Sequence, residues 1–295
     1  MNPIPTARGL RFFAAVLAFA LASGALAQTA TPTVQKTLPE GKKIVEDTIE
    51  AMGGKEAIEK LESSKMMAEM SVGPNPAMAV MTTYWAKPDL FMMKQSVQGM
   101  VIILGYDGKI GWTSNPMSGG YELLEDEQIE QVRGQANMHG NITRMAEDFQ
   151  ELETVDLVDF EGQKCYKVRM VPKTDDESEE AQEEAPAPEQ FSLFNAKTKL
   201  LDAMQMSQET PMGAMTVTIK FKDWKKINDV MFYHRMIVEQ TGQPPMEMRY
   251  TQIEFNKVDP SVFEAPEAVK ELAKEREEAK KQEEGEKPDA PGTDG

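Results

Sequence analysis

The chain has little of what enzymes and metal proteins commonly use. It contains one cysteine, Cys165, and two histidines, His139 and His234, in 295 residues. A single cysteine excludes an intramolecular disulfide, and neither histidine falls in a zinc-binding spacing such as His-Glu-x-x-His. No serine lies in a Gly-x-Ser-x-Gly nucleophile elbow. The sequence therefore predicts a protein that is not an enzyme, with no cofactor and no metal site. His139 is expected in a turn between helices, and His234 and Cys165 within strands.

Positive charge and aromatic side chains are also scarce. Aspartate and glutamate number 49 against 32 lysines and arginines, which gives a formal net charge of −17. A chain this acidic is repelled by phosphate backbones. Aromatic residues make up only 7% of the chain, too few for a continuous surface on which bases or sugars could stack. We expect no nucleic-acid partner.

Long apolar runs are missing as well, apart from a short one near the N-terminus. Two arginines precede the run Phe12 to Leu21, and Ala25-Leu26-Ala27 supplies the small residues that a signal peptidase reads. This pattern predicts a signal peptide over residues 1–27, cleaved between Ala27 and Gln28, and a periplasmic or otherwise exported protein. No later segment reaches ~18 uncharged apolar residues, so no transmembrane segment is expected in the mature protein.

Three segments fall outside any helix or strand pattern of a folded core. Residues 28–39 contain Thr and Pro and are expected to form a flexible linker. Residues 173–190 hold eight acids against one lysine, a composition that predicts a disordered acidic loop between two strands. Residues 267–295 alternate Glu with Lys and Arg and then turn to Gly, Pro and Asp, which predicts a charged, solvated helix and a disordered tail. Residues 40–266 show no break in composition and are expected to form one domain.

Within that domain, helical periodicity gives way to strand periodicity. A helix with apolar residues on one side is expected from Glu40 to the glycines Gly53-Gly54, which end it. Further helices are expected at 55–61, 122–133 and 141–149. Elsewhere apolar and polar residues alternate, most clearly from Met215 to Phe221. The pattern predicts an α+β fold with roughly ten to eleven antiparallel strands.

The turns between these strands carry a recognisable set of signatures. One signature is a predicted hairpin, Gly105-Tyr106-Asp107-Gly108 with Gly111-Trp112, in which Asp-Gly is a strong hairpin signal. A second signature precedes it, Tyr84-Trp85-Ala86-Lys87-Pro88-Asp89. A third follows it, Ile253-Glu254-Phe255-Asn256 with Asp259-Pro260-Ser261-Val262-Phe263 and Pro266. In this order they resemble the LolA/LolB-like family of periplasmic outer-membrane lipoprotein carriers and sorting proteins, over roughly Glu40 to Pro266.

The resemblance implies an incomplete, half-open antiparallel β-barrel around an apolar cavity, with helices acting as a lid. It also implies that acyl chains of a lipid or lipoprotein bind in the cavity, as outer-membrane lipoprotein sorting requires. The residues expected to line the cavity alternate along the predicted strands: Met66, Met70, Met78, Val80, Met92, Ile102, Leu104, Met215, Val217, Ile219, Phe221, Met246 and Met248. Trp85, Trp112 and Trp224 end strands and are expected at the rim, bordering the mouth or stapling the barrel.

Methionine is abundant, with 22 residues, and three interpretations remain open. Flexible thioethers suit a cavity that accepts variable acyl chains, and they also replace Leu or Ile in an ordinary core. Thioethers bind Cu(I) too, and the candidate clusters are Met66-Met67 with Met70, Met92-Met93, Met204 with Met206, and Met246 with Met248. Because the methionines are spread over nearly every strand, a single copper site is disfavoured.

Taken with the resemblance, these features predict an exported, non-catalytic binding protein that holds lipid or lipoprotein acyl chains. Two alternatives stay open. One is a structural or sensory envelope module with a packed interior, whose charged tail recruits an envelope protein partner. The other, less favoured, is a methionine-based Cu(I)-binding protein.

Overall fold

The computed structural model describes residues 38–116, 119–136, 138–173, 189–210 and 213–285. These residues belong to one compact unit. The expected signal peptide and most of the expected linker lie outside the described residues. So do residues 174–188 of the acidic segment and the last ten residues of the expected tail.

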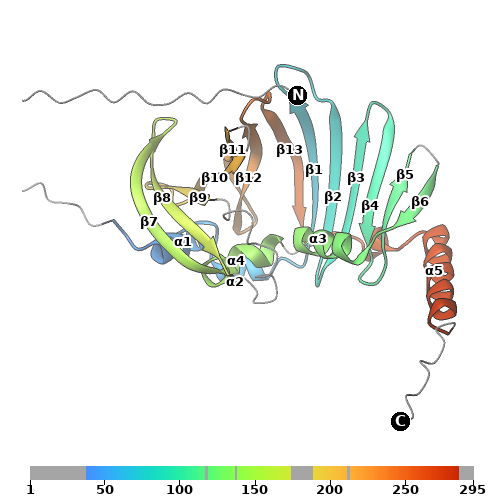
Figure 1. Cartoon of the computed structure of the whole chain (residues 1–295). Coiled ribbons are helices and arrows are strands. Elements are labelled where there is room, and N and C mark those ends of the chain that lie inside the picture. The colour runs from blue at the N-terminus through green and yellow to red at the C-terminus, as the bar shows by residue number, and fades with distance from the viewer. Residues whose placement is uncertain (1–37, 117–118, 137, 174–188, 211–212, 286–295) are drawn as a thin grey trace, which may run out of the picture. The chain divides into compact units, whose positions relative to one another are not determined.

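The described elements are mostly strands, with helices before, between and after them (Figure 1). The helices are α1 (Gly41–Ala51), α2 (Lys55–Glu59), α3 (Asp126–Ala136), α4 (Met138–Asp148), the 3-10 turn η2 (Pro260–Phe263) and α5 (Glu267–Gly285). The strands are β1 (Ser63–Val72), β2 (Ala79–Ala86), β3 (Leu90–Val97), β4 (Met100–Tyr106), β5 (Gly111–Asn115), β6 (Gly120–Leu123), β7 (Phe149–Phe160), β8 (Gln163–Pro172), β9 (Glu189–Asn195), β10 (Leu201–Thr210), β11 (Gly213–Ile227), β12 (Val230–Gln240) and β13 (Met246–Phe255).

All 13 strands form one antiparallel sheet in the order β6-β5-β4-β3-β2-β1-β13-β12-β11-β10-β9-β8-β7. Every neighbouring pair is consecutive in the chain except β1 with β13. The sheet therefore consists of two meanders, β1–β6 and β7–β13, joined by a single ladder. Because β6 and β7 stand at opposite ends of this order, the sheet stays open. The predicted half-open antiparallel barrel is confirmed, with 13 strands in place of the expected ten to eleven.

Several boundaries differ from the sequence prediction. Glu122 and Leu123 were expected to open a helix, but they end β6, and α3 begins only at Asp126. Phe149 opens β7 instead of ending a helix. Glu189 and Gln190 open β9 instead of closing the acidic loop. At β6 the reason is tertiary packing: Leu123 packs against the buried cluster around Trp112, which outweighs the helical propensity of the neighbouring acids.

The predicted hairpin is confirmed, and a close approach explains its glycine. Gly105 pairs with Trp112 across β4 and β5, and a Cβ on Gly105 would lie 2.3 Å from the Trp112 ring. The Asp107 carboxylate accepts hydrogen bonds from the backbone N–H groups of Lys109 and Ile110. Asp107 is thus occupied in shaping the turn, as expected of a structural residue.

The ladder between β1 and β13 is fastened at its end by Asn256. Its side-chain oxygen accepts hydrogen bonds from the backbone N–H groups of Glu62 and Ser63, and its amide donates to the carbonyl of Lys60. Asn256 adopts a φ of 58°, which Asn tolerates better than most residues. The signature Ile253-Glu254-Phe255-Asn256 therefore joins the first strand to the last.

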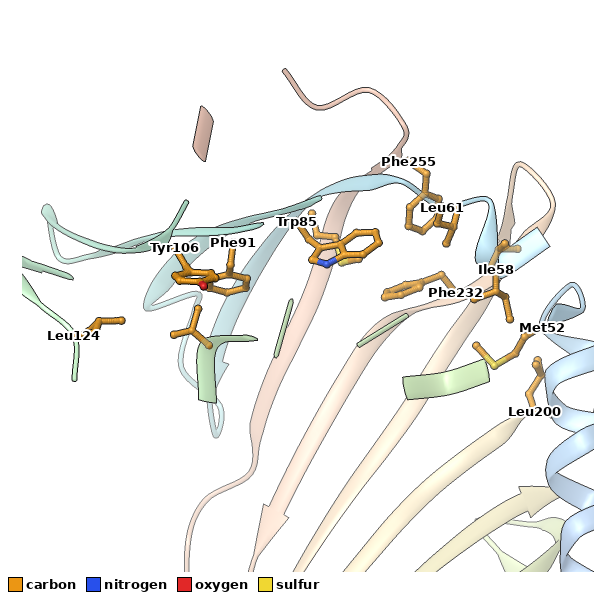
Figure 2. Close-up of a cluster of buried hydrophobic side chains, with 13 residues drawn as sticks. Met52, Ile58, Leu61, Trp85, Phe91, Tyr106, Leu124, Leu200, Phe232 and Phe255 are labelled. Atoms are coloured by element: carbon orange, nitrogen blue, oxygen red, sulfur yellow. The ribbon is translucent and has the colours of Figure 1, made fainter. Parts of the chain in front are cut away.

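The two faces of the sheet bury different clusters. On one face, which we call the cavity face, α1 to α4 pack near the strands (Figure 1), and two large clusters form there. Figure 2 shows the first cluster, with Trp85, Phe91 and Phe232 among its members. On the opposite face, the outer face, η2 and α5 cover β2 to β6. Trp112 and Val269 are fully buried in this outer cluster, so the first turn of α5 is anchored to the sheet, whereas the whole helix was expected to be solvated.

Candidate functional site

A cavity of about 920 Å³ lies between the cavity face and helices α1, α3 and α4. A volume of this size falls in the range of small-molecule sites, ~300–1,000 Å³. The helices contribute Val45, Thr48, Ile49, Met52, Gln131, Gly134, Met145 and Asp148, and the sheet contributes Met66, Ala68, Met81, Thr83, Phe91, Met93, Phe149, Phe194, Leu201, Met204, Phe221, Trp224, Phe232, Tyr233 and Tyr250.

Helix α1 forms one wall because its apolar residues recur on one side. Ile44 and Val45 are buried in the second cavity-face cluster, and Met52 in the first. The Thr48 hydroxyl lies 2.6 Å from the carbonyl oxygen of Lys199 and 2.9 Å from that of Ile44. Its single proton is therefore used by these carbonyls, and α1 is held against the turn between β9 and β10.

Helices α3 and α4 close the space from the other side. α4 contacts α1, α2 and β7, whereas α3 contacts β3 and β4. Arg133 of α3 donates a 2.8 Å hydrogen bond to the carboxylate of Asp89 in the turn between β2 and β3. Both α3 residues in the lining, Gln131 and Gly134, are exposed, so this helix lies at the boundary between the cavity and solvent.

Strands β1 to β3 present alternate residues to the cavity. The lining includes Met81 and Thr83 of β2, and Phe91 and Met93 of β3. Met92, between the last two, is buried instead in the outer cluster. The strict period of two therefore decides which methionine of an adjacent pair can meet a ligand.

An aromatic group from β11 to β13 forms the deep wall. Tyr233 lies at its centre, with ring centroids 4.9 Å from Phe221, 5.6 Å from Trp224 and 4.6 Å from Phe232. Its ring also meets Tyr250 edge to face at 5.6 Å. Such contacts hold large rings in fixed orientations, so this wall is pre-formed.

Few polar groups reach the cavity. The rings of Tyr233 and Tyr250 are in contact. Burial raises the pKa of both phenols, that of Tyr233 well above its ordinary value. Both therefore stay uncharged at neutral pH. Of the described lining residues, Asp148 on α4 is the only one with an ionisable carboxyl or amino group, and its carboxylate faces Arg144 at 4.0 Å. The site is apolar, and its polar groups include the two phenols, the side chains of Thr48, Thr83 and Gln131, and this one carboxylate.

The structure places three of the sequence-predicted site residues in the wall: Met66, Phe221 and Trp224. Others share the cavity face but lie beyond the lining. Met70 pairs with Met248, which pairs with Met236, which pairs with Phe221, so this row continues the face outward. By the same alternation Met215, Val217, Ile219 and Met246 lie farther along their strands, and Ile102 and Leu104 lie on β4.

Four predicted site residues lie elsewhere. Met78 precedes β2 and Val80 lies within it, and each is 43% exposed. In β2 the odd-numbered residues, from 79 to 85, point to the cavity face, and Val80 points to the outer face. Met92 and Trp112 are buried in the outer cluster, so Trp112 borders no mouth. Trp85 faces inward but is buried in the first cavity-face cluster and is not part of the lining.

Several lining residues were missed from the sequence. Met81 and Thr83 were missed because the even-numbered residues Met78 and Val80 were chosen, whereas the odd-numbered residues of β2 face the cavity. Tyr233 and Tyr250 lie in strands whose two faces are both mixed in polarity, so alternation gave no preference. The helical residues were expected only as part of a lid. Their signal was the apolar stripe of α1, which lines the cavity with Val45, Ile49 and Met52.

Neither Cys165 nor His234 is part of the cavity lining. Cys165 is fully buried in a separate cluster, its thiol donates to Asp202 at 3.3 Å, and burial raises its pKa to about 12. His234 Nδ1 lies 3.2 Å from the carbonyl oxygen of Phe232. His139 lies within α4, not in the expected turn. In the described part of the chain, no three His, Cys, Asp or Glu side chains are placed to hold a metal.

Copper ligation by the two pairs of adjacent methionines, Met66-Met67 and Met92-Met93, meets a geometric obstacle. Met66 faces the cavity, and Met93 does so too, whereas their neighbours Met67 and Met92 point to the outer face by the period of two. Adjacent members of a pair therefore cannot ligate one ion together.

No family model matches the sequence, and no curated protein matches it either. Solved structures do match. A DUF1329 family protein from Desulfovibrio piger aligns with a TM-score of 0.50 at 12% identity, over 77% of this chain and 98% of that chain. A putative outer membrane lipoprotein-sorting protein domain from Vibrio parahaemolyticus aligns with a TM-score of 0.46 at 13% identity, over 74% and 97%. A LolA superfamily protein from Nitrosomonas europaea aligns with a TM-score of 0.46 at 10% identity, over 77% and 99%.

These likenesses concern the fold. At 12% identity, the Desulfovibrio piger structure shows that this chain shares an architecture with it and says nothing of a ligand. The half-open antiparallel sheet with covering helices, which the resemblance implied, is present in this chain. Among the described helices, none has the length and apolar character to cross a bilayer.

Proposed function

We propose that this protein is an exported, non-catalytic carrier or receptor that binds the acyl chains of a lipid or lipoprotein in the cavity between the sheet and helices α1, α3 and α4. The observation that supports it best is the cavity itself: about 920 Å³, lined almost entirely by apolar side chains. A module with a packed interior would fill this space with side chains. The expected signal peptide supports export.

The physical basis is burial of methylene groups. Each CH₂ that moves from water into an apolar site contributes about 0.8 kcal/mol, so on the order of ten methylenes give a gross gain of about 8 kcal/mol. Part of this gain is offset by the loss of translational and chain freedom. The flexible Met52, Met81 and Met204 in the wall suit chains of differing length.

A matched pair of substitutions on β2 tests the site. Thr83→Trp places a large ring in the cavity, whereas Thr82→Trp places the same ring on the outer face, one residue away. Thr83 pairs with Met93 and lines the cavity, and Thr82 pairs with Lys94. Excluding two ligand methylenes weakens binding by roughly tenfold. We expect this loss for Thr83→Trp only, measured by titration with a fluorescent fatty-acid analogue.

Native mass spectrometry of protein purified from an envelope fraction provides the second measurement. A lipid adduct is expected on the wild type and is reduced by Thr83→Trp. Consistently ligand-free protein that also takes up no fluorescent analogue would contradict the proposal and favour the structural or sensory alternative. N-terminal sequencing of the same preparation checks cleavage before Gln28.

A further inference from the structure

The sheet side of the apolar cavity carries a pair of phenols. Tyr233 of β12 and Tyr250 of β13 both line the space, and their rings meet edge to face at 5.6 Å. Tyr233 is packed among Phe221, Trp224 and Phe232. The pair is therefore held by aromatic contacts on several sides and cannot turn out to bulk water without dismantling the wall.

At least one donor remains in this pair even when the two phenols bond to each other. A phenol oxygen can accept one bond and still donate its own proton, so a bond between the two hydroxyls uses only one of their two protons. One phenol O–H is thus left as a donor inside an apolar site, where a hydrogen bond to a ligand is stronger than in water.

The charges of the lining restrict which acceptor suits that donor. Among the described lining residues there is no lysine or arginine, and the one carboxylate, on Asp148, is negative. A ligand carboxylate drawn into the cavity would lose its hydration without gaining a cation, and it would be repelled by Asp148. A carbonyl of an ester or an amide accepts the same hydrogen bond and carries no such penalty.

We propose that the cavity selects acyl chains that carry an uncharged carbonyl, in an ester or an amide linkage, and that the Tyr233–Tyr250 pair holds this carbonyl. The inference rests on the proposed function, because it names the chemical class of the ligand bound in the same cavity. The chain supplies the affinity, and the phenol pair fixes the depth at which the linkage sits.

The test compares ligands that share one chain length. Hexadecane, methyl palmitate, N-methylpalmitamide and palmitate, delivered from cyclodextrin at neutral pH, compete with a bound apolar fluorophore. One hydrogen bond changes affinity by about 2- to 12-fold. We expect the ester and the amide to bind tighter than hexadecane by this factor, and palmitate to bind more weakly than the ester. The ratio of ester to amide distinguishes an acyl ester from an N-acylated ligand.

Substitutions locate the effect. Tyr250→Phe and Tyr233→Phe keep the rings and remove the hydroxyls, and each is expected to reduce the advantage of methyl palmitate over hexadecane while leaving hexadecane unchanged. Tyr106→Phe is the matched control, because Tyr106 is a buried tyrosine of the neighbouring cluster outside the lining.

The outcomes separate this inference from the proposed function. Equal affinity for hexadecane and methyl palmitate, or tightest binding of palmitate, would overturn the inference and leave acyl-chain binding standing. Failure of every chain to displace the fluorophore would overturn both.

Discussion

The two faces of the meander β1–β6 are built from similar residues, but one face is covered by a filled cluster and the other borders a cavity. On the outer face, Trp112 crosses Gly105, and η2 and α5 cover it, so the cluster is filled. On the cavity face, Met81, Thr83 and Met93 look across an open space toward the helices. The difference lies in what packs on each face. Phe263 of η2 and Val269 in the first turn of α5 fill the space over Trp112, whereas α1, α3 and α4 leave a cavity between themselves and the strands.

The largest effect is expected when the side chain that fills the outer cluster is removed. Trp112 has an exposed fraction of 0%, and its replacement by Ala leaves a hole next to Gly105, which has no side chain to fill it. We expect Trp112→Ala to lower the free energy of unfolding by about 3–5 kcal/mol, measured by urea denaturation. Trp224→Ala, in the cavity wall, is the matched comparison.

Trp224 is already bordered by empty space, so its removal costs fewer contacts. We therefore expect Trp224→Ala to lower stability less than Trp112→Ala does and to change ligand affinity more. An equal loss of stability from both substitutions would contradict the distinction between a filled and an open face.

A smaller effect is expected from two adjacent methionines on β3. Met92 is 5% exposed in the outer cluster, whereas Met93 lines the cavity. Met92→Ala is expected to lower the free energy of unfolding by about 2–4 kcal/mol, and Met93→Ala by less than about 2 kcal/mol. Ligand titration should show the reverse order, with Met93→Ala altering chain-length preference. Identical behaviour of the two variants would show that alternation on β3 does not separate the two environments.

The smallest effect concerns the outer face of the second meander, where Cys165 is buried beside Asp202. Burial raises the pKa of its thiol from 9.0 to about 12. The folded state therefore keeps this proton where the unfolded chain releases it, and stability falls as pH rises through that window, by about 1 kcal/mol per pH unit. Well below pH 9, where the unfolded chain also keeps this proton, the thiol contributes no slope.

The measurement is the pH dependence of the unfolding midpoint for the wild type and for Cys165→Ala. Buried tyrosines titrate in the same range, so the difference between the two slopes, not either slope alone, reports the thiol. Parallel slopes would mean that Cys165 is reached by water, which would remove the contrast between a dry outer face and an accessible cavity.

How far the sequence could predict this arrangement is clearest on β11 and β2. On β11, Lys220 and Lys222 mark one face as solvated. The residues on the other face were therefore predicted to face the cavity, and one of them, Phe221, does line it. On β2 both faces carry apolar residues, because one meets the cavity and the other is partly covered. Alternation then divides the β2 residues into two groups but does not show which group faces the cavity. Val80 was assigned to the cavity face, but it lies on the other one.

The phenol pair could not be predicted for a different reason. Asp223 adopts a φ of 56°, which turns β11 so that Phe221 and Trp224, an odd number of residues apart, both line the cavity. Tyr233 is brought in opposite Trp224. A period of two cannot anticipate such a turn, because positive φ at a residue other than Gly leaves only a weak trace in the sequence. The turn signatures were predictable because their glycines and asparagines act locally.

The ladder between β1 and β13 also determines when a binding site can exist. It is the only pairing between the two meanders, and its strands are separated by almost the whole domain, so its formation carries a large loop-closure cost and comes late in folding. The cavity wall takes Met66 and Ala68 from the first strand and Tyr250 from the last. A chain that is still emerging therefore has no competent site. Acquisition of a ligand must wait until synthesis and folding have delivered the final strand.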